Sequence, residues 1–174
     1  MTVKAFLERN FAEPLTRDRV LDAGSGAQWC FDLHRVRWNG SFLALDGHSM
    51  ICVFAAPDME SARLALRDPK TDLSRFWPGT LHVAAAGIEP TVAVERTFAA
   101  PVRYEDIEAL GKAKAWCSST HHVQHAYTAF SLDRKRMLCF YSAPDAEAVR
   151  RVQREAGAPF DAIWAGISIA PGQR

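Results

Sequence analysis

The sequence predicts an α+β protein made of two tandem copies of one folding unit. The first observation is a repeat: rare residue types recur at one constant offset, half the length of the 174-residue chain, without any gap. Trp-Cys at 29–30 recurs at 116–117, and Ala-Pro-Asp at 56–58 recurs at 143–145. The second observation is that strand-type and helix-type hydrophobic patterns follow one another in the same order in both copies.

Each copy is expected to contain a strand, a helix, two strands, a second helix and a last short strand. Proline at 14 and 101 ends the first strand, and the helix after it carries apolar residues at spacings of three and four. The expected ranges are Val3–Phe11 and Val92–Phe98 for the first strand, Arg17–Cys30 and Tyr104–Cys117 for the first helix, and Val36–Leu45 and Val123–Leu132 for the second strand.

The third strand and the elements after it follow from turn and cap residues. Asp46-Gly47 is typical of a hairpin turn, and Asp133-Arg134 is its weaker counterpart. The aspartate of each Ala-Pro-Asp can accept bonds from free amides at a helix N-terminus. The remaining ranges are Met50–Ala55 and Met137–Ser142 for the third strand, helices continuing through Arg67 and Glu155, and last strands near Leu81–Ala84 and Ile167–Ala170.

The order β-α-β-β-α-β is that of a ferredoxin-like unit, so we assign one repeat to residues 1–86 and a second to 87–174. Such a sheet has helices on one face only. We therefore expect the two repeats to pack sheet to sheet about a pseudo-twofold axis, as in dimeric α/β barrels. The protein would then be a monomer with internal symmetry or a homodimer.

Composition excludes several classes of function. The formal net charge is only +1, which gives no basic excess for nucleic acid. An RNA-recognition domain, which shares the element order, requires a glycine that the third strand at 136–141 lacks. No apolar run is long enough for a membrane span. The N-terminus does not read as an export signal, so we expect a cytoplasmic protein with four free thiols.

Three motifs resemble a family of small bacterial ferredoxin-like proteins of otherwise unknown function, some described as nickel-binding. They are Glu-Arg-Thr-Phe with a later proline at 95–101, Met-x-Cys-x-Tyr-x-Ala-Pro-Asp-Ala-Glu-Ala at 137–148, and Gly-x-Pro-Phe-Asp at 157–161. The second half matches over nearly its whole length and the first more loosely. The resemblance implies the fold and pairing through the open sheet face. Histidines of the nickel-binding members are missing here, since 95–97 and 108–114 contain none.

Histidines nevertheless make a divalent transition metal, nickel or zinc, the candidate cofactor. Cys30 and His34, like Cys117 and His121, have the helical spacing that places two ligands on one face. The structural alternative is a core cysteine and a histidine at a helix C-terminus. The candidate metal ligands are His121, His122 and His125.

Strand alternation predicts a small-molecule pocket on the open sheet faces. In this reading the second repeat supplies polar groups, namely Glu95, His125, Tyr127, Cys139 and Tyr141, and the first supplies an apolar wall of Trp38, Phe42 and Phe54. The alternative is a packed interface with satisfied polar tips. The favoured function is binding of a small molecule or metal ion between the two sheets. The rival is a cofactor-free enzyme of the monooxygenase or isomerase type, by analogy of fold alone.

Overall fold

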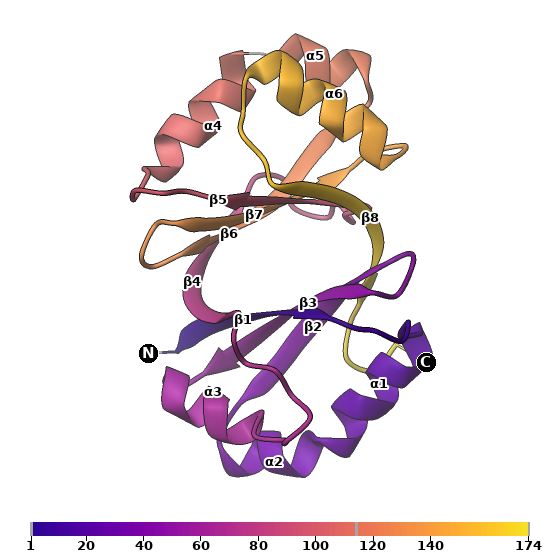
Figure 1. Cartoon of the computed structure of the whole chain (residues 1–174), viewed down its shortest axis with the longest axis vertical. Helices are drawn as coiled ribbons and strands as arrows, with labels where there is room; N and C mark the ends of the chain where they lie inside the picture. The colour runs from indigo at the N-terminus through magenta and orange to yellow at the C-terminus, as the bar shows by residue number, and fades with distance from the viewer. Residues whose placement is uncertain (1, 114, 174) are drawn as a thin grey trace. The chain divides into compact units, whose positions relative to one another are not determined.

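The computed structural model describes residues 2–113 and 115–173 and divides the chain into two compact units. Unit 1 contains the residues up to Gly79 and those from Ile167 onward, and unit 2 is Thr80–Gly166. Figure 1 shows the elements of both units along the chain.

Unit 1 carries four antiparallel strands in the order β4-β1-β3-β2. Its elements are β1 Val3–Asn10, α1 Arg17–Gly26, α2 Gln28–Leu33, β2 Arg37–Ala44, β3 Ser49–Ala56, α3 Met59–Ala65 and the first part of β4 Phe76–Val83. This strand order is that of a ferredoxin-like unit.

Unit 2 repeats the arrangement with the strand order β8-β5-β7-β6. Its elements are β5 Val92–Thr97, α4 Tyr104–Ala113, α5 Ala115–Thr120, β6 Gln124–Ser131, β7 Arg136–Ser142, α6 Ala146–Ala156 and the first part of β8 Ala162–Ile169. The fold class predicted from the sequence, α+β with two βαββαβ-like halves, is therefore confirmed.

The fourth strand of each half begins in one unit and ends in the other. In β4, Gly79 pairs with Lys4 of unit 1, whereas the amide of Ala84, just after β4, bonds to the Ala126 carbonyl in unit 2. The compact units therefore do not coincide with the sequence repeats assigned to 1–86 and 87–174. Those boundaries stay a prediction about the duplication.

Two groups of elements differ from the sequence-based ranges. The last strands begin at Phe76 and Ala162 and so include Trp77 and Trp164, which we placed before them. The first helix of unit 1 is two shorter helices, α1 and α2. In unit 1 the break falls at Ala27, directly after Gly24-Ser25-Gly26, residues that favour helix interiors poorly.

The predicted helix caps are confirmed. The Asp58 carboxylate accepts a hydrogen bond from the Ser61 amide at 2.7 Å, and Asp145 accepts one from the Ala148 amide at the same distance. These aspartates satisfy amides that the first helical turn leaves free, and they fix where α3 and α6 begin.

Each sheet buries its main apolar cluster under its own helices, which lie on one face (Figure 1). Met50, Cys52 and Phe54 pack in unit 1 against residues of α1 and α2, and Met137 and Cys139 do the same in unit 2. The sequence-based assignment of Phe54 and Cys139 to the open face was therefore wrong. The third strands are apolar at nearly every position, so alternation alone did not tell which set faces the helices.

All four cysteines are free, as predicted. None of the helices in the described part of the chain is long and apolar enough to cross a membrane.

Candidate ligand-binding cavity

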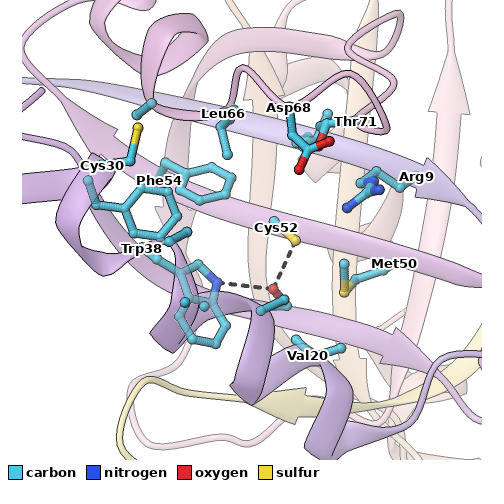
Figure 2. Close-up of a pocket in the computed structure, with 18 of the residues that line it drawn as sticks. Arg9, Val20, Cys30, Trp38, Met50, Cys52, Phe54, Leu66, Asp68 and Thr71 are labelled. Atoms are coloured by element: carbon cyan, nitrogen blue, oxygen red, sulfur yellow. Dashed lines mark hydrogen bonds between the residues drawn. The ribbon is translucent and has the colours of Figure 1, made fainter.

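A cavity of about 620 Å³ lies within unit 1, between the helix-covered face of the sheet and the helices α1 and α2. Residues after α3, from Leu66 to Thr71, close another side (Figure 2). Its apolar walls include Trp38, Met50 and Phe54. The volume is within the usual range for small-molecule sites.

Three side chains in the cavity wall form a short chain of hydrogen bonds (Figure 2). The Trp38 indole N–H donates to the Ser41 hydroxyl at 3.1 Å, and that hydroxyl donates to the Cys52 sulfur at 2.9 Å. The pairing of β2 with β3 shifts register between Trp38 and Gly40, and this bulge turns Trp38 toward the same face as Ser41. Since the indole N–H is satisfied, the Trp38 ring offers the cavity an apolar surface.

Gly24 makes room for that ring. A Cβ atom at Gly24 would lie 2.5 Å from Cζ3 of Trp38, well inside van der Waals contact. The glycine in α1 therefore allows the indole to lie against the helix backbone, where it forms part of the cavity wall.

The Cys52 thiol is not a nucleophile at neutral pH. Burial raises its pKa to about 11, outweighing the opposing effects of the Ser41 hydrogen bond and of Arg9. A thiol needs its thiolate form for attack or for metal binding. The cavity therefore offers a neutral sulfur surface rather than a reactive one.

Most of the charged side chains that line the cavity are cationic. Among the described residues that line it, four are cationic and one is a carboxylate: Arg9, Arg19, Arg67, Lys70 and Asp68. The Arg9 guanidinium lies over the Phe11 ring, 4.8 Å from its centre. Within the described ranges, the Arg9 side chain makes no hydrogen bond or ion pair.

Unit 2 contains an aligned set of residues with different chemistry. His125 Nε2 lies 2.8 Å from the Thr128 hydroxyl, which donates to the Cys139 sulfur at 3.3 Å. Arg96, at the position of Arg9, is only 2% exposed and donates to Cys139 and to the Gln153 amide oxygen. In this half the arginine is part of a buried polar network.

Burial shifts the titration of two groups in this network. Desolvation lowers the pKa of His125, and Arg96 lowers it further, so the imidazole is neutral in the folded protein over a wider range. Desolvation also raises the pKa of Tyr141 to about 12. Both groups therefore stay uncharged near neutral pH.

The second repeat is similar to a known family. Residues 93–165 match the model of the family described as SCO4226-like, nickel responsive protein. The resemblance stated from the sequence motifs is thereby confirmed for this part of the chain. No curated protein matches the sequence.

Solved structures show likeness of fold. A candidate chlorite dismutase, TA0507, aligns over 97% of this chain and 95% of its own, with 12% identity and a TM-score of 0.53. A candidate monooxygenase from Lactobacillus acidophilus NCFM aligns over 98% and 97%, with 8% identity and a TM-score of 0.46. A heme-binding protein from Thermus thermophilus aligns over 96% and 90%, with 10% identity and a TM-score of 0.44. At 12% identity, the similarity to the candidate chlorite dismutase supports the fold class alone.

The predicted metal ligands do not come together in the described part of the region that matches the SCO4226-like model. His121 and His122 follow α5, whereas His125 lies in β6 beside Thr128. In the described ranges, 2–113 and 115–173, no group of three histidine, cysteine or carboxylate side chains could hold a metal ion. These residues do not fit a nickel ion, and the metal assignment stays a prediction.

The other predicted site residues fall on two faces of their sheets. His125, Cys139 and Tyr141 lie together under the helices of unit 2, with the His125 and Tyr141 rings 5.0 Å apart. Trp38 and Phe54 line the cavity of unit 1. The prediction that all eight side chains lie on the open sheet faces was therefore wrong. Their role in binding a ligand stays a prediction.

Glu95, Tyr127 and Phe42 lie on the opposite sheet faces. Glu95 accepts hydrogen bonds from Trp164 at 2.8 Å and Arg136 at 2.6 Å. The Tyr127 ring stacks on Phe140. Phe42 follows Ser41 in β2 and so points away from the cavity. Glu8 repeats the arrangement of Glu95: it accepts hydrogen bonds from Trp77 and Arg75, and these offset the cost of burying its carboxylate.

Sequence reasoning did not select Arg9, Ser41, Cys52 or Gly24 as site residues. A signal for the first of them was present in the repeat itself. Leu66 occupies the position of Gln153, so the first copy lacks the amide that holds the arginine in the second.

Proposed function

We propose that unit 1 binds a small, largely apolar molecule in its cavity. The observation that carries this proposal is the cavity itself, whose wall is mostly aromatic and aliphatic with few polar groups. Sites for small molecules usually have this composition. Each methylene group that a ligand buries there contributes roughly 0.8 kcal/mol.

The chemistry of the lining supports binding rather than nucleophilic catalysis. The buried sulfur of Cys52 is protonated at neutral pH, and the Ser41 hydroxyl already donates a hydrogen bond to that sulfur. Neither group is activated by an adjacent base within the Trp38–Ser41–Cys52 chain. The match to the SCO4226-like family, which is described as nickel responsive, covers residues 93–165. None of these residues lines the cavity.

A titration of the full chain with 1-decanol, followed by tryptophan fluorescence, tests the proposal. Ala65 is buried and lines the cavity, so Ala65→Leu places a branched side chain in the space that a ligand would occupy. If the introduced leucine excludes two methylene groups of the ligand, the affinity for decanol falls about tenfold.

The matched control is Val152→Leu at the aligned position of unit 2, where Val152 is also buried. This variant should bind decanol like the wild type. Absence of saturable decanol binding to the wild type would overturn the proposal, as would equal affinities of the Ala65→Leu variant and the wild type.

A further inference from the structure

We infer that the ligand of the unit 1 cavity is an amphipathic carboxylate whose acidic group pairs with Arg9. The inference rests on the proposed function, because it concerns the same cavity. The inference specifies the charge of the ligand and names the residue that binds the charged group.

The first support is the contrast between the two aligned arginines. In unit 2, Arg96 donates to Cys139 at 2.9 Å and to the Gln153 amide oxygen. In unit 1, Leu66 stands where Gln153 would be and offers no acceptor from its side chain. Arg9 therefore keeps its donors available in the described structure, beside a cavity that Leu66 also lines.

The second support is that nearby carboxylates are engaged elsewhere. Asp68 accepts from the backbone amide of Lys70 at 2.7 Å, and Asp72 accepts from that of Ser74 at 2.8 Å. These bonds hold each carboxylate at its own turn. The hydrogen bonds from Ser74 lower the pKa of Asp72 and the charge of Arg9 adds a smaller effect, but neither aspartate forms an ion pair with Arg9 among the described residues.

The third support is the local charge balance. Arg9, Arg19 and Lys70 are three of the four cations around the cavity, against the single carboxylate of Asp68. A ligand with an ammonium group would meet repulsion there, whereas an anion would be attracted. A guanidinium matches the planar shape of a carboxylate and can donate two parallel hydrogen bonds to it.

The geometry also orients such a ligand. Arg9 lies at one side of the cavity and Trp38, Phe54 and Cys30 at the other (Figure 2). A carboxylate bound at Arg9 would therefore place its apolar tail against the aromatic wall. The neutral Cys52 thiol lies between them as part of the apolar surface (Figure 2).

The test compares decanoate, 1-decanol and decylamine, which share one apolar chain, on the full protein at low salt. We expect decanoate to bind about tenfold or more tightly than decanol, because a hydrogen bond to a charged group contributes that much. Decylamine should bind more weakly than both. Arg9→Met should remove the preference for decanoate while decanol affinity changes less than about twofold, and Arg9→Lys should keep part of the preference.

Arg19→Met is the matched control, because it removes another lining cation while Arg9 remains, and it should keep most of the preference for decanoate. Thermal unfolding of each variant shows that it is folded. If decanol binds but Arg9→Met leaves the preference intact, or if decylamine binds best, the inference is wrong and the proposed function stands. If decanol does not bind the wild type, both the proposed function and this inference fail.

Discussion

In unit 2 the guanidinium of Arg96 donates a hydrogen bond to the side-chain amide oxygen of Gln153, at 2.5 Å. The arginine is 2% exposed, and its Nε atom has no hydrogen-bond partner in the described structure. A buried charge with so few acceptors depends strongly on each of them. Gln153 therefore has a structural role. Unit 1 has Leu66 at the aligned position, so it lacks this acceptor.

Replacing Gln153 by leucine should lower the free energy of unfolding by about 2–3 kcal/mol, because it leaves a buried charged donor without its acceptor. Urea denaturation measures this change. Gln153→Glu keeps an acceptor oxygen and should cost less. A loss below about 0.5 kcal/mol in the leucine variant would show that Arg96 does not need Gln153.

The reverse substitution, Leu66→Gln, should install in unit 1 an acceptor for Arg9. We expect decanoate affinity to fall about tenfold, since the guanidinium then has a competing intramolecular partner, while decanol affinity changes little. Calorimetric titration with both ligands measures the ratio. An unchanged ratio would mean that the amide does not reach Arg9.

Gly24→Ala should move the Trp38 ring. The new Cβ would lie 2.5 Å from the indole, so the variant should be about 1–3 kcal/mol less stable than expected from the helix preference of alanine. Gly111→Ala is the aligned control: among the described residues, no atom apart from the helix's own backbone lies within 4 Å of a Cβ there, and it should gain roughly 0.5–1 kcal/mol. Equal gains in urea denaturation would contradict the role of Gly24.

Acid pH should destabilise the protein through His125. Desolvation holds the pKa of the folded imidazole below the ordinary value of 6.5, so as pH falls through that value the unfolded chain binds the proton more readily. Stability due to the neutral imidazole is present above pH 6.5 and is lost below it. His125→Gln removes this group, so its stability should fall less than that of the wild type between about pH 7.5 and 5. Parallel stability curves for the two proteins would refute the assignment.

Much of the fold could be predicted from the sequence, because rare residues such as Trp77 and Trp164 align in the two copies and Asp58 and Asp145 mark helix starts. Which way the strands face could not. The bulge after Trp38 interrupts alternation along β2, so Trp38 and Phe42, predicted to share a face, point to opposite sides.

The candidate site was only partly accessible to sequence reasoning. Trp38 and Phe54 were predicted as ligand contacts and do line the cavity, although on the helix-covered face. The difference between Leu66 and Gln153 was visible in the aligned copies. Its meaning depends on the contact of Arg96 with Gln153 and on Arg9 and Leu66 lining one cavity, and one sequence does not contain such tertiary information.

The most direct test is a two-dimensional ¹H–¹⁵N NMR titration of the full chain with decanoate, observing the indole N–H signals. Trp38 and Trp29 line the cavity, whereas Trp116 and Trp164 belong to unit 2. We expect the Trp38 signal to shift with saturation and Trp29 to follow, while Trp116 and Trp164 stay in place. Saturable shifts confined to Trp116 and Trp164, or no saturable shift at Trp38, would contradict ligand binding in the unit 1 cavity.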